Sequence, residues 1–297
     1  MSWQNWILTR ALRRWIKPNS LRNQDVATSR RQTNRVPFPA HLAPGWRIRS
    51  TPNGEWIEPV PPDQTARTRC VLYLHGGGYI AMSAVTHRAL TSRLATYSAA
   101  SLFALNYRLA PEHPFPAALE DALAAYRALV ANGTAASHIV VAGDSAGGGL
   151  ALALLVALRD AGDTLPAAAV LFSPWTDLAA TGQSIVTNNA SDALFFGSWV
   201  AQTARHYLGH TPATNPLASP VYADLRGLPP LLIQVSGSEV LLDDSRRVAE
   251  HAQLCNVDVT LQIWPDQPHG WQIFAPILPE ARAALRDAGA FIRTRLG

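Results

Sequence analysis

Three residues that could together perform nucleophilic catalysis lie in separate parts of the chain. Ser145 lies in Gly143-Asp-Ser-Ala-Gly147, a G-x-S-x-G pattern, whereas Glu239 and His269 lie in Ser236-Gly-Ser-Glu239 and Pro268-His-Gly270. A serine hydroxyl becomes a strong nucleophile when a histidine takes its proton and a carboxylate holds the imidazole tautomer. We therefore expect Ser145, Glu239 and His269 to form a catalytic triad.

Two other carboxylates, Asp243 and Asp244, follow Glu239 closely. They fall at the start of an expected helix, where acidic side chains are favoured as caps and by the helix dipole. Glu239 instead follows the apolar strand 231–235, so we assign the acid to Glu239.

A glycine-rich segment, His75-Gly-Gly-Gly78, follows another apolar strand. Acyl transfer builds negative charge on a carbonyl oxygen, and backbone N–H groups in a loop without side chains can approach that oxygen. We expect the N–H groups of Gly76, Gly77 and Ala146 to form this oxyanion hole. His75 and Asp144 are expected to support the loop and the serine turn.

The elements that position these residues alternate between strands and helices. Strands are expected at 70–74, 101–105, 139–141, 167–172, 231–235 and 257–264, and helices at 86–99, 117–131, 150–158, 243–255 and 280–296. This alternation predicts an α/β fold with a mostly parallel sheet covered by helices on both faces. Segments 46–49 and 55–58 predict an antiparallel edge, and a helix at 195–208 lies within an expected cap insertion at about 178–215. We expect an N-terminal arm at 1–45 and a catalytic domain at 46–297.

Several motifs together resemble those of the bacterial hormone-sensitive-lipase-like esterases of the α/β-hydrolase superfamily. The shared segments are 75–78, 107–112, 115–118, 143–148, 173–177 and 268–270. Glu239 and Trp271 stand where this family usually has Asp and Phe. The resemblance implies the same nucleophile and base, a helical cap, no cofactor, and hydrolysis of short- to medium-chain acyl, aryl or lactone esters. The alternatives are a non-catalytic small-molecule binder and a membrane-surface lipid-ester hydrolase.

The N-terminal arm differs from the rest of the chain in charge. Residues 1–50 hold ten basic side chains against Asp25 alone, a net charge of +9, which leaves −5 for the remainder of the 297 residues. A helix at 3–17 carries Trp3, Trp6 and Trp15 on an apolar stripe, which needs a partner surface. We expect residues 1–40 to form a lid over the site, with a homodimer contact or a membrane tether of the helix as alternatives.

The remaining composition excludes several kinds of protein. Two cysteines, Cys70 and Cys255, make neither a disulfide framework nor a metal motif, and the histidines lack ligand spacing, so no metal is expected. No nucleic-acid motif, transmembrane-length apolar run or secretory pattern is present. We expect a cytoplasmic enzyme whose partner is a small-molecule ester.

Overall fold

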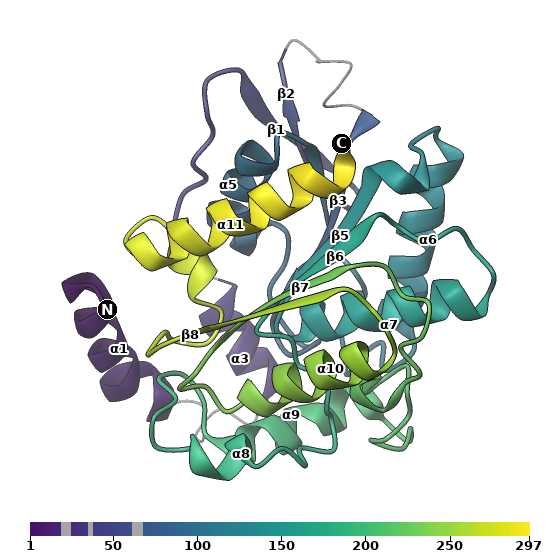
Figure 1. Cartoon of the computed structure of the whole chain (residues 1–297). Helices are drawn as coiled ribbons and strands as arrows, with labels where there is room; N and C mark the ends of the chain where they lie inside the picture. The colour runs from purple at the N-terminus through teal and green to yellow at the C-terminus, as the bar shows by residue number, and fades with distance from the viewer. Residues whose placement is uncertain (19–24, 35–37, 61–67) are drawn as a thin grey trace.

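The architecture follows from a computed structural model, which describes residues 1–18, 25–34, 38–60 and 68–297. One eight-stranded sheet runs through the molecule in the order β1-β2-β4-β3-β5-β6-β7-β8 (Figure 1). Its first two strands pair antiparallel, and every pairing from β4 to β8 is parallel. The strands are β1 (Trp46–Thr51), β2 (Gly54–Pro59), β3 (Cys70–Leu74), β4 (Ser101–Leu105), β5 (Ile139–Asp144), β6 (Ala168–Phe172), β7 (Leu231–Ser236) and β8 (Val259–Trp264).

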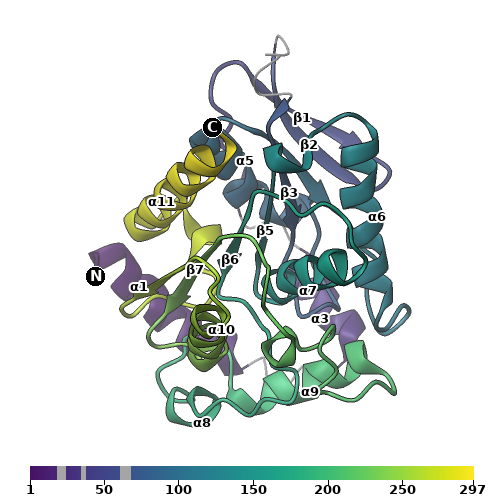
Figure 2. The ribbon, with the colours of Figure 1, turned by 45° about the vertical axis from the view of Figure 1, so that its right-hand side comes forward.

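Helices cover both faces of the sheet, which explains why its central strands are apolar throughout. Side chains such as Leu72 and Val141 face α6 (Ala117–Ala131), α7 (Ala146–Asp160) and α10 (Leu242–Leu254). Their neighbours Val71 and Val140 face α5 (Arg88–Ser98) and α11 (Pro279–Leu296) on the other side. Figure 2 shows these two helical layers with the sheet between them. The predicted α/β class is therefore confirmed.

Two helices had not been predicted from the sequence. In α3 (Val26–Thr33), the Asp25 side chain accepts hydrogen bonds from the N–H groups of Ala27 and Thr28 and so begins the helix. The short α8 (Ser184–Thr187) precedes α9 (Gly197–Leu208), and both lie between β6 and β7 within the expected 178–215 insertion. Parts of the expected 1–45 arm, residues 19–24 and 35–37, lie outside the described residues.

The N-terminal helix forms as predicted. The prediction that its tryptophans pack over the site is wrong. Helix α1 (Trp3–Ala11) continues into a π-helical turn, Leu12–Ile16. Trp3 and Trp15 are 70% and 68% exposed, whereas Asn5 and Thr9 are buried. The side that faces the body carries Leu12 as well as these polar residues, and Asn5 Nδ2 donates to the Asp266 carbonyl at 2.9 Å. No helix in the described ranges is long and apolar enough to cross a membrane.

Candidate active site

Ser145 occupies a strained turn between β5 and α7. Its backbone has φ 53° and ψ −121°, a conformation that non-glycine residues rarely adopt. The turn is tight because Gly143 and Gly147 allow close approach: a Cβ at Gly147 would lie 2.0 Å from the Leu74 carbonyl oxygen. The Ser145 N–H donates to the Phe172 carbonyl at 2.8 Å. The serine is therefore held where the parallel strands end, at the N-terminus of a helix.

Glu239 and His269 meet at the same edge of the sheet. Glu239 Oε2 contacts His269 Nδ1, and both residues are buried. The other oxygen, Oε1, accepts hydrogen bonds from the Ser236 N–H at 2.6 Å and from Ser173 Oγ at 2.8 Å. Ser173 follows β6, whose Phe172 carbonyl binds Ser145, so these loops link the carboxylate to the serine turn.

Asp243 and Asp244 make other contacts. Asp243 accepts from the Ser184 N–H at 2.8 Å, and Asp244 accepts from the N–H groups of Thr176 and Asp177 at 2.7 and 2.8 Å. Both lie in the first turn of α10, as expected, but no side chain caps this helix, so the capping role is wrong. Both aspartates instead bind loops that follow β6, because those loops present unpaired N–H groups to the start of α10.

The environment of His269 prepares its other ring nitrogen to accept a proton. Burial lowers the pKa of His269, but the charge of Glu239 and its contact with the ring outweigh burial, and the pKa is raised. Nε2 is buried and has no hydrogen-bond partner among the described residues. The edge of the ring packs against Phe195 with centroids 5.2 Å apart.

The glycine-rich loop differs from the prediction at Gly76. Its N–H donates to Asp144 Oδ1 at 2.8 Å and is therefore not available to a substrate oxygen, which corrects the donor role expected for it. No acceptor within the described chain takes the N–H groups of Gly77, Gly78 or Ala146. The sequence could not distinguish these glycines because the difference lies in the path of the loop.

Asp144 supports this loop through a buried network. The network includes Tyr73 and His87, whose roles were not predicted from the sequence. Asp144 accepts from Tyr73 Oη at 2.7 Å, and the His87 ring lies 3.3 Å from its carboxylate. Burial raises the pKa of Asp144, but His87 and these hydrogen bonds outweigh burial and lower it to about 2. His75 stacks on Tyr107 and lies outside the pair formed by Glu239 and His269. The contact between Asp144 and His87 is thus a second carboxylate–histidine contact, and it supports the glycine-rich loop.

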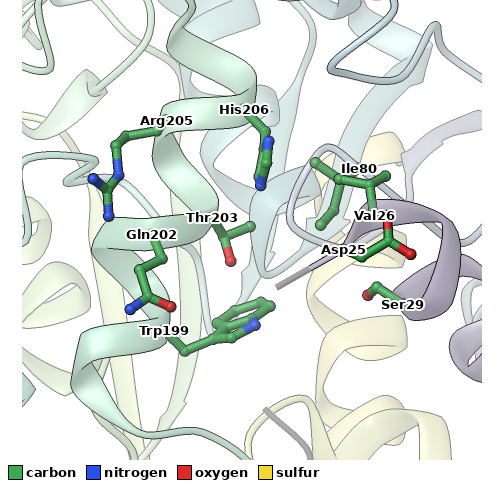
Figure 3. Close-up of a pocket in the computed structure, with 9 residues that line it drawn as sticks. All are labelled: Asp25, Val26, Ser29, Ile80, Trp199, Gln202, Thr203, Arg205 and His206. Carbon is green, nitrogen blue, oxygen red and sulfur yellow. The ribbon is translucent and has the colours of Figure 1, made fainter. Parts of the chain in front are cut away.

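A cavity of about 360 Å³ lies between α3 and α9, next to the glycine-rich loop. Figure 3 shows Trp199, Thr203 and His206 of α9 facing Val26 and Ser29 of α3, with Ile80 beside them. A Cβ at Gly78 would lie 2.9 Å from Thr203 Cγ2, so the loop is in direct contact with the cavity wall. In the part of the chain that the structure describes, no cluster of His, Cys, Asp or Glu could hold a metal.

Basic side chains of the N-terminal arm reach the loops around the site, among them Lys17 and Arg30. Lys17 Nζ donates to the carbonyls of Asn189 at 2.5 Å and Asp192 at 2.8 Å. The Asp192 carboxylate accepts from the Val240 N–H at 2.8 Å, next to Glu239. Arg30 of α3 donates to the Ile80 carbonyl at 2.7 Å, behind the glycine-rich loop.

Known proteins with similar sequences or structures are hydrolases and esterases. Residues 71–273 match the model of a family described as α/β hydrolase fold. The chain is 49% identical over 243 residues to an acetyl-hydrolase of Streptomyces hygroscopicus, covering 82% of this chain and 80% of that protein. It is 37% identical over 229 residues to an esterase of Acinetobacter venetianus, covering 77% and 76%. A solved esterase of the bacterial hormone-sensitive lipase family superimposes with a TM-score of 0.83 at 42% identity, covering 95% of this chain and 99% of that one.

The residues matched by the family model, 71–273, include Ser145, Glu239 and His269. They confirm the predicted resemblance and exclude the non-catalytic binder, because the similar proteins are named as esterases and hydrolases. The chain belongs to the α/β-hydrolase family, as a serine hydrolase of its bacterial hormone-sensitive-lipase-like esterase branch that acts on carboxylic esters.

Proposed function

We propose that the chain hydrolyses short- to medium-chain acyl esters through an acyl-enzyme, with Ser145, His269 and Glu239 as the triad. The observation that carries this proposal is the buried His269 ring, with Nδ1 against Glu239 and Nε2 without a partner in the described chain. An imidazole held in this way has its basic nitrogen available to a nearby hydroxyl.

In the first step, Ser145 Oγ attacks the carbonyl carbon of the ester and its proton moves to His269 Nε2. The bond to the alcohol oxygen then breaks, and His269 returns the proton to that oxygen as the alcohol leaves. Water repeats the sequence: it loses a proton to His269, attacks the acyl carbon and releases the carboxylic acid with Ser145 restored. Glu239 remains ionised and stabilises the imidazolium in both halves.

The developing oxyanion needs donors that are not already occupied. We assign it to the N–H groups of Gly77, Gly78 and Ala146, which have no acceptor in the described part of the protein. The Gly76 N–H serves the loop instead, by binding Asp144. For this reason we assign Gly78, in place of Gly76, as the third donor to the oxyanion.

The cavity between α3 and α9 is proposed to receive part of the ester. Its volume of about 360 Å³ suits a small acyl or aryl group, and it adjoins the loop that carries the proposed donors. In this proposal the arm at 1–45 contributes α3 to a cap over the catalytic domain at 46–297, together with the insertion at 178–215. The similarity to a protein named acetyl-hydrolase supports a preference for short acyl chains.

Replacement of the nucleophile tests the proposal. We expect Ser145→Ala to fold normally and to lose on the order of 10⁶ in kcat on a p-nitrophenyl ester, the loss typical of a missing serine nucleophile. Ser137→Ala, a change at an exposed serine that precedes β5, is the matched control and should retain full activity. Mass spectrometry after rapid quench should find the acyl group on Ser145 of the unmodified protein. Acylation elsewhere, or a fully active Ser145→Ala variant, would overturn the assignment.

A further inference from the structure

The outward face of α1 combines aromatic and basic side chains. Trp3, Trp6, Ile7, Arg10 and Arg14 recur at intervals of three and four residues and are exposed to solvent. We call this set the Trp–Arg face. Figures 1 and 2 show α1 at the periphery of the molecule.

The helix is fixed to the body from its opposite side. Ser2 Oγ donates to Glu280 at 2.9 Å, Asn5 binds the Asp266 carbonyl, and Lys17 binds two carbonyls beyond the end of the π-helical turn. On the side that faces the body, Asn5, Thr9 and Leu12 are buried and Leu8 packs against the core, whereas Trp3 and Trp6 are exposed. The Trp–Arg face is thus displayed by a helix that is already anchored.

The charge of this region indicates what kind of surface it fits. No acidic residue occurs before Asp25, and Arg10 and Arg14 project from the same face as the tryptophans. The Arg10 guanidinium lies 3.8 Å from the centroid of the Trp6 ring, which places a cation and an indole side by side. Indole rings are enriched at the boundary between lipid headgroups and acyl chains, and guanidinium groups bind lipid phosphates there.

We propose that the Trp–Arg face binds the surface of an anionic phospholipid bilayer, with α1 lying in the plane of the headgroups. A second copy of the chain fits this face less well. A symmetric dimer would bring the face against itself and bury at least four guanidinium groups without carboxylates from either helix. A bilayer supplies phosphates for the arginines and an apolar boundary for the indoles at the same depth.

This binding mode has a consequence for access to the site. Lys17, at the end of the same helical segment, holds the loop that contains Asp192, and Phe195 of that loop packs on His269. The helix proposed to lie on the headgroups is therefore connected to the loop that contacts His269. Binding itself does not depend on the proposed triad, so its test has a readout separate from hydrolysis.

The test is co-sedimentation of the full chain with vesicles of phosphatidylcholine alone and of phosphatidylcholine mixed with phosphatidylglycerol. We expect the protein to bind the mixed vesicles at low salt, to dissociate at high salt, and to bind the neutral vesicles weakly. Arg14→Glu changes the local charge by two units and should weaken partition about thirty-fold. Arg286→Glu, the same change at an exposed position of α11, is the matched control and should bind normally.

Trp3→Ser tests the apolar part of the face and should also reduce binding to the mixed vesicles. Hydrolysis of a water-soluble p-nitrophenyl ester should be unchanged in both variants, which shows that they remain folded. Equal binding to both kinds of vesicle, or equal loss in Arg14→Glu and Arg286→Glu, would overturn the proposal. So would sedimentation velocity that finds a dimer which Trp3→Ser dissociates, because the face would then bind a second copy.

Discussion

Replacement of Glu239 by Gln is the sharpest test of how the acid holds the base. The carboxylate has two distinct oxygens: Oε1 accepts from the Ser236 N–H and Ser173 Oγ, and Oε2 contacts His269. An amide can present an acceptor on only one side. If its NH₂ faced the Ser236 N–H, two donors would meet where 2.6 Å now separates donor and acceptor. The amide must therefore turn its NH₂ towards His269.

That orientation selects the wrong tautomer of the base. Nδ1 of His269 would accept a hydrogen bond from the amide, the proton would move to Nε2, and Nε2 could no longer take the proton of Ser145. The corresponding change from acid to amide in a well-studied serine protease lowers kcat about 10⁴-fold. This factor corresponds to about 5 kcal/mol of transition-state stabilisation, and we expect a similar loss here.

The assay is the pH dependence of kcat/KM for a soluble ester, which reports the ionisation of the free enzyme. The negative charge of Glu239 raises the pKa of His269, and the base works only when neutral. The residual activity of Glu239→Gln should therefore rise at lower pH than that of the unmodified protein. Asp243→Asn, a similar change at a carboxylate that binds Ser184, should leave both rate and profile unchanged. A folded Glu239→Gln variant with more than a tenth of full activity would refute this reasoning.

Three further changes test other parts of the structure. Lys17→Met removes a buried ammonium from two carbonyls and should cost about 1–3 kcal/mol of unfolding free energy; an unchanged thermal midpoint would contradict the importance of these bonds. Ser29→Trp should fill the cavity of Figure 3 and lower kcat/KM for butyryl esters more than for acetyl esters. Ala27→Trp, at an exposed position of the same helix, should leave this ratio unchanged. Equal effects of the two variants would exclude the cavity as a subsite. The pKa of Asp144 falls from 3.8 to about 2 on folding, so the ionised carboxylate stabilises the protein above pH 4. This stabilisation is lost as the pH falls towards 2. Asp144→Asn should therefore cost about 2 kcal/mol at pH 7 and less at pH 3, as urea unfolding would measure.

The sequence was sufficient to predict where the catalytic candidates lie because they follow apolar strands of one parallel sheet. Ser145, Glu239 and His269 come from strands whose carboxyl ends must share an edge, so their proximity follows from topology. The direction of a single N–H group does not follow in this way. Gly76 and Gly78 are the same residue type two positions apart, and only the folded loop turns the first towards Asp144.

Helix periodicity likewise predicted the faces of α1 but not which face would bind the body. The face with Asn5, Thr9 and Leu12 is the bound one, and the carbonyls of Asp266, Asn189 and Asp192 that its segment binds are positioned by distant parts of the fold. Helix α3 was missed because its residues form no apolar stripe. Contacts of Arg30 with the carbonyls of Ile80 and Ala110 hold it in place.

The anchoring of α1 also sets an order of events during synthesis. Its contacts join Ser2 to Glu280, Asn5 to Asp266, and Lys17 to Asn189 and Asp192. The helix therefore leaves the ribosome long before any of these partners, and it cannot complete its contacts until β8 and α11 have been made. Until then, the helix lacks part of the contacts that fix its orientation on the body. A segment at the beginning of the chain is thus among the last to reach its native position, contrary to the usual progression from the N-terminus.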